Sequence, residues 1–193
     1  MIKTFQNCII YLIGYPGTGK YTIAKKIVSF APEFRLVDNH LINNPLFSII
    51  LADGKTPLPS RVWKNVGQIW EAVLDTMIHI SPPDYSFVLT NALLNSQADQ
   101  NWFAEVEHMA DQRKALFVPV ILTVSLDEHR RRIVMKDRAE RFKEIDPDSP
   151  DLYAKEDSII KLNHPNLLLL DTSCLTAEES AESIRHHLLQ LLP

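Results

Sequence analysis

The chain alternates between short apolar runs and longer segments in which apolar residues recur at helical spacing. The first run, residues 8–13 (CIIYLI), is rich in β-branched side chains and does not alternate with polar residues. A strand of this kind is typical of a parallel sheet that is covered on both faces. Four further runs predict strands at residues 34–37, 85–90, 116–123 and 167–170.

Between these runs, four segments follow the helical period. One begins near Ser60, a candidate N-cap, and continues through Ile78; the others cover residues 20–30, 99–113 and 177–192. Strands that alternate with helices predict an α/β protein with a parallel sheet and right-handed crossovers. The length of 193 residues fits a single domain, 1–193.

Two stretches, residues 39–60 and 126–163, are too long for simple crossovers between a strand and a helix. In an open α/β sheet such insertions gather around the ligand crevice at the carboxyl ends of the strands. We therefore expect residues 39–80 to form a substrate-binding insertion and residues 126–163 to form a lid.

Composition narrows the functional classes. Hydrophobic residues make up 46% of the chain and charged residues 23%, as in an ordinary soluble domain. The net charge of −4 provides no general basic field for nucleic acid or an anionic membrane. The N-terminal apolar run is too short for a signal peptide, and none reaches the about 18 residues of a membrane span. We expect a cytoplasmic monomer or homodimer that binds neither nucleic acid nor membrane.

A glycine-rich loop (GYPGTGK) joins the first predicted strand to the first predicted helix, and it holds three of the five glycines in the chain. Glycine lets backbone N–H groups close on phosphate oxygens, and the helix N-terminus adds the positive end of its dipole. The motif places a lysine at the β- and γ-phosphates of a nucleoside triphosphate, which we expect to be ATP. The predicted nucleotide-binding residues are Gly14, Tyr15, Pro16, Gly17, Thr18, Gly19, Lys20, Tyr21 and Thr22.

The loop departs from its motif at one position. The residue after Lys20 is normally Ser or Thr, whose hydroxyl ligates Mg²⁺, but here it is Tyr21. A phenol oxygen lies several ångströms further from the backbone, so it cannot occupy the same ligand position. Either other groups and waters hold Mg²⁺, or metal-dependent turnover is weakened. Thr22 remains available for the α-phosphate.

On these residues the chain resembles the small P-loop kinases, in particular the shikimate kinase-like, gluconate kinase-like and chloramphenicol phosphotransferase-like group. The resemblance covers nearly the whole chain: the phosphate loop, an acid after the second strand, an arginine-bearing lid and a closing helix. It implies three α/β/α layers with a five-stranded parallel sheet in the order 2-3-1-4-5. It also implies a helical lid over ATP and transfer of the γ-phosphate to a small molecule, with Mg²⁺ as a cofactor.

In that group an Asp at the end of the second strand touches the acceptor hydroxyl or a metal-bound water, and Asp38 stands at that place. A carboxylate there is suited to orient or deprotonate an alcohol and to help hold Mg²⁺. The alternative role is an Asx turn or a helix cap. His40 and Arg61 are weaker candidates for substrate contacts, Arg61 for an anionic substrate.

The lid candidate is the basic segment 130–143 (RRRIVMKDRAERFK). On a helix, Arg138 and Arg141 share a face, and closure of that face over the γ-phosphate would stabilise the charge that develops in transfer. Arg138 is therefore the predicted catalytic arginine and Arg141 a predicted nucleotide contact. The alternative is a solvated charged helix with two i,i+4 ion pairs, Glu128–Arg132 and Asp137–Arg141.

Two features lie near the remaining strand ends. Thr172 follows the last strand, where related kinases cradle the adenine; the alternative is an N-cap for the closing helix. The third strand ends in Thr90 and Asn91 without an acidic residue, so the sequence carries no evident Walker B carboxylate. Together with Tyr21, this leaves the predicted metal site short of ligands.

Three functions remain open on this evidence. The leading one is a small-molecule kinase in which Lys20 and Arg138 stabilise charge and Asp38 positions or deprotonates the acceptor hydroxyl. The second is a nucleotide-binding module with little or no transfer activity, which the altered metal positions favour. The third is a nucleoside or nucleotide kinase, because three tryptophans are available to stack on a base, although their helical spacing favours core packing. These are Trp63, Trp70 and Trp102.

Overall fold

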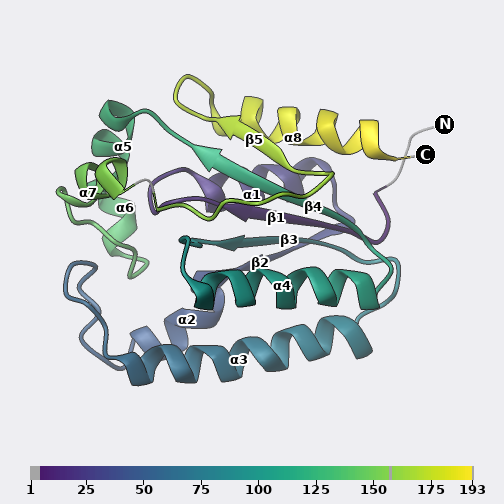
Figure 1. Ribbon diagram of the computed structural model, residues 1–193, viewed down its shortest axis with the longest axis horizontal. Helices are drawn as coiled ribbons and strands as arrows, with labels where there is room; N and C mark the ends of the chain where they lie inside the picture. The colour runs from purple at the N-terminus through teal and green to yellow at the C-terminus, as the bar shows by residue number, and fades with distance from the viewer. Residues whose placement is uncertain (1–4, 157, 193) are drawn as a thin grey trace.

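The computed structural model describes residues 5–156 and 158–192 as a five-stranded, all-parallel sheet covered by helices (Figure 1). The strand order is β2-β3-β1-β4-β5, which confirms the predicted order. The strand bounds match the prediction or differ from it by one residue. The strands are β1 (Cys8–Ile13), β2 (Phe34–Asp38), β3 (Ser86–Asn91), β4 (Leu116–Thr123) and β5 (Leu168–Asp171).

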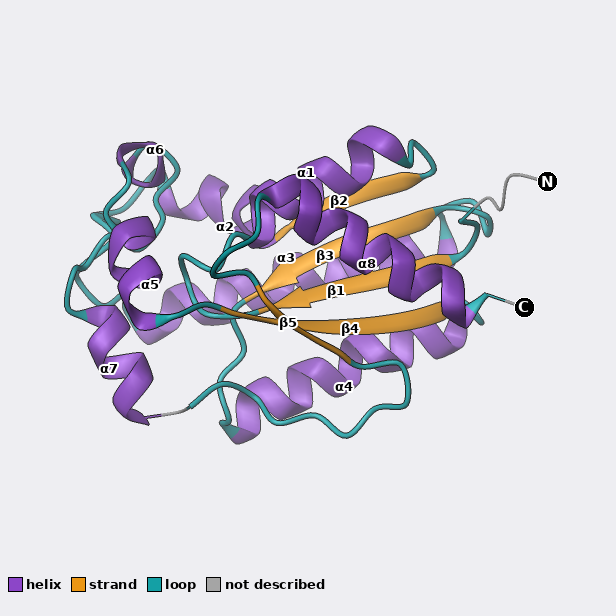
Figure 2. Cartoon of the chain, turned by 90° about the horizontal axis from the view of Figure 1, so that it is seen from above, coloured by secondary structure: helices purple, strands orange, loops and turns teal. Residues whose placement is uncertain are grey.

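Helices cover both faces of the sheet. One face carries α1 (Lys20–Phe30) and α8 (Ala177–Leu191), and the opposite face carries α3 (Ser60–His79) and α4 (Gln97–Gln112) (Figures 1 and 2). Alternate residues of β1 therefore enter different cores: Ile10 packs with α1 and α8, and Tyr11 packs with α3 and α4. Every residue of β1 is buried, which explains the continuous apolar run.

Helix ends depend on caps more than on apolar period. Ser60 does not cap α3; it is the first helical residue, and Pro59 occupies the N-cap. Helix α4 begins two residues earlier than predicted because the Ser96 hydroxyl accepts a hydrogen bond from the Asp99 amide. None of the helices in the described part of the chain has the length and apolar character needed to cross a bilayer.

The two insertions lie at the carboxyl ends of the strands, away from both termini (Figure 1). The first contains α2 (Asn39–Phe47), and the second contains α5 (Leu126–Ile133), α6 (Lys136–Ala139) and α7 (Ser149–Glu156). The prediction of one charged helix over residues 130–143 is wrong, because α5 and α6 are separate and Phe142 has a left-handed φ of 53°. Arg141 lies beyond the end of α6, so it does not share a helical face with Arg138.

Candidate active site

The phosphate loop curls around its own lysine. Lys20 Nζ donates to the carbonyl oxygens of Gly14 at 2.6 Å and Tyr15 at 2.9 Å. Gly19 is the N-cap of α1 and offers no side chain to the first-turn N–H groups, which leaves them available to an anion. The loop thus has the geometry of a phosphate site, with the lysine held where a nucleotide would displace it.

Only glycine fits at position 17, because of the backbone conformation there and because of the neighbouring side chain. Its φ is 99°, and a Cβ at this position would lie 2.9 Å from Cδ2 of His129. The imidazole Nε2 of His129 lies 2.6 Å from the Pro16 carbonyl oxygen, which can only accept, so Nε2 carries the proton. Burial lowers the pKa of His129, while the hydrogen bond to the Pro16 carbonyl oxygen acts in the opposite direction. This lid histidine supports the loop, and no feature of the sequence pattern marked it.

Tyr15 also connects the loop to the lid. Its ring stacks on Tyr153 of α7 with centroids 4.4 Å apart, and His129 completes the stack at 6.3 Å from Tyr15. Its carbonyl oxygen also accepts from the Thr18 hydroxyl at 3.0 Å. The predicted nucleotide contact at Tyr15 therefore falls to its backbone, while its side chain docks α7 against the loop.

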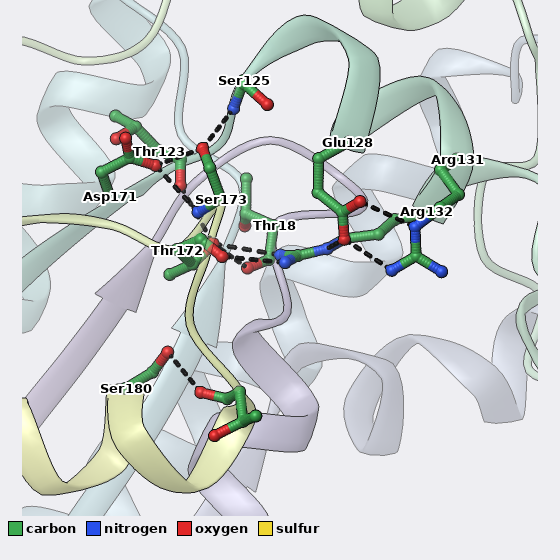
Figure 3. A network of polar contacts seen from close by, with 11 residues as sticks. Thr18, Thr123, Ser125, Glu128, Arg131, Arg132, Asp171, Thr172, Ser173 and Ser180 are labelled. Carbon is green, nitrogen blue, oxygen red and sulfur yellow. Dashed lines mark hydrogen bonds and ion pairs between the residues drawn. The ribbon is translucent and has the colours of Figure 1, made fainter.

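Arg132 and Thr172 lie beside the loop (Figure 3). Arg132 Nη2 donates to the Thr172 carbonyl oxygen at 2.8 Å, and Nη1 donates to its hydroxyl at 3.1 Å. Glu128 accepts from Arg132 Nε at 2.6 Å, so this predicted ion pair is confirmed. Thr172 does not cap α8, because Thr176 does so in a capping box. Thr172 is buried, and it fixes a planar guanidinium at the edge of the phosphate loop.

Asp38 is held by the neighbouring strand. Its Oδ1 accepts from Thr90 Oγ1 at 2.5 Å, and the two residues are register partners at the ends of β2 and β3. Asp38 is only 3% exposed. It stands at the N-cap of α2, yet its side chain makes no capping hydrogen bond. The third strand thus contributes a hydroxyl that holds Asp38, although it carries no Walker B carboxylate.

The second insertion contributes Lys143 to the cavity that Asp38 and Lys20 also line. Burial, followed by the positive charges of Lys143 and Arg138, lowers the pKa of Lys20 to about 7. Burial also lowers the pKa of Lys143, while the charge of Asp38 acts in the opposite direction. Arg138 lines the same cavity, where its Nε and Nη2 donate to the Glu144 carbonyl oxygen at 3.0 and 2.8 Å. Asp38 therefore shares the cavity with Lys20, Arg138 and Lys143, and no pattern along the chain singled out Lys143.

Tyr21 carries lid cations on its ring. The Arg141 guanidinium carbon and Lys143 Nζ each lie 4.6 Å from the ring centroid, and Lys25 Nζ lies 5.7 Å from it. The alternative prediction of an Asp137–Arg141 ion pair is wrong, because these two described residues form none. Arg141 and Lys143 instead make cation–π contacts, which are effective within about 6 Å of a ring centroid.

A cavity of about 1050 Å³ extends from the phosphate loop past Asp38 into the first insertion. Beyond Asp38 its walls are largely apolar. Trp70 is buried and packs edge-on against Trp102 at 5.4 Å, as the core-packing alternative expected, whereas Trp63 is 51% exposed. The phenylalanine and tryptophan residues that line the cavity are Phe47, Trp63, Trp70, Trp102 and Phe142; aliphatic residues such as Leu58, Val66 and Leu93 line it beside them, and Tyr21 and Tyr153 also line it.

The remaining polar candidates differ in their placement. Asn43 lines the cavity and is buried, and its Oδ1 has no hydrogen-bond partner among the described residues. His40 also lines the cavity, with Nδ1 lying 3.2 Å from Asn44 Oδ1. Burial, aided by the charge of Lys143, lowers the pKa of His40 to about 4, so the ring is neutral at pH 7 and a weak base. Arg61 is exposed and does not line the cavity.

The donor set for a divalent metal is poor. Within residues 5–156 and 158–192 there is no group of three or more His, Cys, Asp or Glu side chains that could hold an ion. Asp38 already accepts from Thr90 and faces Lys143, and the Tyr21 ring is engaged by cations. Hard oxygen ligands for Mg²⁺ are therefore scarce where the motif would place them.

No protein-family model matches the sequence, and no curated protein matches it either. Solved structures do share its fold. A gluconokinase from Sinorhizobium meliloti 1021 gives a TM-score of 0.65 at 14% identity, with 98% of this chain and 95% of that chain covered. A sugar kinase from Janibacter sp. HTCC2649 gives 0.62 at 14% identity, with 94% of each chain covered. The Mycobacterium tuberculosis APS kinase, solved with AMPPNP and APS, gives 0.54 at 15% identity, with coverages of 95% and 98%. The chain thus has the fold of the small P-loop kinases.

Proposed function

We propose that the protein is a kinase that transfers the γ-phosphate of ATP to a hydroxyl group of a small molecule. The observation that carries this proposal is that Lys20, at the phosphate loop, and Asp38, at the end of β2, line one cavity. A phosphate-binding lysine and a candidate base are thereby brought together with space for a second substrate beyond them. The shared fold with kinases supports the same proposal.

The nucleotide is expected to bind across the loop, with its phosphates on the N-terminus of α1. Lys20 then exchanges the carbonyl oxygens that it contacts in this structure for phosphate oxygens. Arg132 offers a flat guanidinium beside Thr172, which is suited to stack on the base. This assignment keeps Thr172 on the base side, as the resemblance implies, and adds Arg132 to it.

In the transfer step, an oxygen of the acceptor attacks the γ-phosphorus while the bond from that phosphorus to the bridging oxygen of ADP breaks. ADP leaves with the electron pair of that bond, and the acceptor hydroxyl gives its proton to Asp38. Thr90 engages Oδ1 of Asp38 and leaves Oδ2 for the acceptor. Lys20 and Arg138 stabilise the charge that develops on the phosphoryl oxygens.

The acceptor is expected to be uncharged, with a flat or apolar body. Away from the phosphate loop the lining is mostly apolar, with tryptophan and phenylalanine beside aliphatic residues, and the charged residues Lys55 and Asp99 also line the cavity. Asn43 supplies an unpartnered amide oxygen in that half, which suits an N–H or O–H donor on the acceptor. The exposed position of Arg61 gives no support to an anionic acceptor.

The resemblance also implies Mg²⁺, but the residues of this chain do not fit it well. Tyr21 replaces the hydroxyl ligand, and the adjacent space holds lid cations. The transfer step is therefore assigned to the side chains of the protein alone.

A panel of acceptors tests the proposal. ATP is mixed with aromatic alcohols, nucleosides and sugar acids, and ADP release is followed with the wild type and with Asp38→Asn. We expect ADP release to rise with an aromatic alcohol or a nucleoside and to be lost in Asp38→Asn without loss of ATP binding. ATP binding with no acceptor-stimulated release across the panel would instead support the nucleotide-binding module.

A further inference from the structure

The phosphate loop carries an aromatic ring where its motif places a metal-ligating hydroxyl. Tyr21 follows Lys20 directly, and its ring is covered by Arg141 and Lys143 of the lid, both at 4.6 Å. Their positions beside the loop and in the lining of the same cavity bring two positive charges to the expected site of Mg²⁺. Two such side chains together carry the same charge as one Mg²⁺ ion.

We infer that Arg141 and Lys143, seated on Tyr21, replace a metal ion at the triphosphate, so that the site takes metal-free ATP in preference to Mg-ATP. The inference rests on the nucleotide site of the proposed function but not on phosphoryl transfer. It assigns Tyr21 the role of a platform for two lid cations.

The charge balance of the cavity supports this inference. Four basic side chains of the loop and of residues 136–144 line it, against three carboxylates, those of Asp38, Asp137 and Glu144. Glu144 is already engaged by the hydroxyls of Ser149 and Tyr153, and Asp38 by that of Thr90. An excess of half-buried cations is costly unless an anion joins them. The four cations are Lys20, Arg138, Arg141 and Lys143.

A divalent cation would enter this cluster at a disadvantage. It would have to approach the ammonium of Lys143 and the guanidinium of Arg141 in a half-buried space, where like charges repel strongly. It would also lack the hydroxyl ligand, because the oxygen of Tyr21 stands on the far side of the ring from the backbone. Free ATP meets neither obstacle and carries more negative charge than its magnesium complex.

The first insertion holds Lys143 in place. The Ile145 amide donates to the Gly54 carbonyl oxygen at 3.0 Å, and a Cβ at Gly54 would collide with the carbonyl oxygen of Lys143. Gly54 has a left-handed φ of 76°, which favours glycine at this contact. Backbone contacts between the two insertions therefore fix the position of the chain at Lys143.

Calorimetric titrations with ATP test the inference. Each is done in excess EDTA and in excess Mg²⁺, on the wild type and on the variants Lys143→Met, Tyr21→Ser and Lys25→Met. We expect the wild type to bind ATP at least as tightly in EDTA as in Mg²⁺. Lys143→Met should weaken binding in EDTA about tenfold or more, as expected for a lost charge-assisted contact, and weaken binding in Mg²⁺ much less. Tyr21→Ser should create a preference for Mg-ATP, and Lys25→Met, which removes a ring contact of 5.7 Å from a residue that does not line the cavity, should leave the ratio unchanged.

Tighter binding in Mg²⁺ by the wild type, or equal losses for Lys143→Met in both conditions, would overturn the inference and leave the nucleotide site standing. No ATP binding in either condition would remove the nucleotide site and the inference together. Thermal melting of each variant confirms that the comparison is made on folded protein. Because Lys143→Met and Tyr21→Ser perturb the same contact from opposite sides, a folding defect in one leaves the other to decide.

Discussion

The affinity for ATP should fall as pH rises, because Lys20 is largely deprotonated above neutral pH in the free protein. Its pKa is lowered to about 7, first by burial and then by the charges of Lys143 and Arg138. Bound phosphates surround the ammonium with negative charge and raise this pKa. Binding at alkaline pH must therefore be accompanied by uptake of a proton, and the free energy needed to protonate Lys20 weakens the observed binding free energy.

The magnitude follows from the fraction of Lys20 that is protonated before binding. With a pKa of about 7, this fraction is roughly one quarter at about pH 7.5 and roughly one hundredth at about pH 9. If the pKa in the complex exceeds about 10, the affinity falls about 20-fold across this interval, or about 1.8 kcal/mol. This pH interval lies above the pKa of the terminal phosphate, which is about 6, so titration of the ligand contributes little to the pH dependence.

Calorimetric titrations in EDTA, in buffers of different ionisation enthalpy, measure both the affinity and the protons taken up. We expect uptake of roughly three quarters of a proton at about pH 7.5, approaching one at about pH 9. Lys20→Arg is the matched control, because a guanidinium stays charged throughout and should flatten the pH dependence. An affinity that is constant or rises over this interval, or a slope that persists in Lys20→Arg, would refute the reasoning.

Three further predictions concern the support of the site. Gly17→Ala should lower the free energy of unfolding by about 1–2 kcal/mol and abolish ATP binding, because φ is positive and His129 blocks the Cβ; chemical denaturation and calorimetry measure the two effects. Thr90→Val should leave Oδ1 of Asp38 without its donor, cost about 1–3 kcal/mol of stability and slow transfer more than it weakens ATP binding; unchanged ADP release would contradict the assigned role. Acceptor binding should shift the emission of the half-exposed Trp63 to shorter wavelength, and a Trp63→Phe variant should lose that shift; an identical shift with ATP alone would place the change elsewhere.

The sheet was predictable because its central strands are buried on both faces. In β1 every side chain enters a core, so burial leaves a continuous apolar run that period and length identify without further context. The phosphate loop was predictable for a related reason: three glycines, a lysine, a strand and a helix are all local features. The ends of the helices were harder to predict, because a single capping hydroxyl, such as that of Ser96, moves the start of a helix by one or two residues.

The lid residues were not predictable, because their roles depend on contacts between distant segments. Lys143 reaches the loop only because the backbone turns after α6 and is held by Gly54. His129 is buried under the loop from α5, which no periodicity reveals. Arg141 lies beyond the end of α6, so it reaches the cavity from the turn after that helix and not from a helical face shared with Arg138. Thr90 took on importance only once the parallel register set it beside Asp38.

The central claim is that the cavity joins ATP to an acceptor hydroxyl across Asp38, and phosphorus NMR tests it most directly. The protein is mixed with ATP and an aromatic alcohol or a nucleoside, with and without Mg²⁺, and the spectrum is followed over time. The account predicts a phosphomonoester resonance that grows in step with ADP and does not appear with Asp38→Asn. Bound ATP without any monoester, or equal monoester formation by Asp38→Asn, would contradict it.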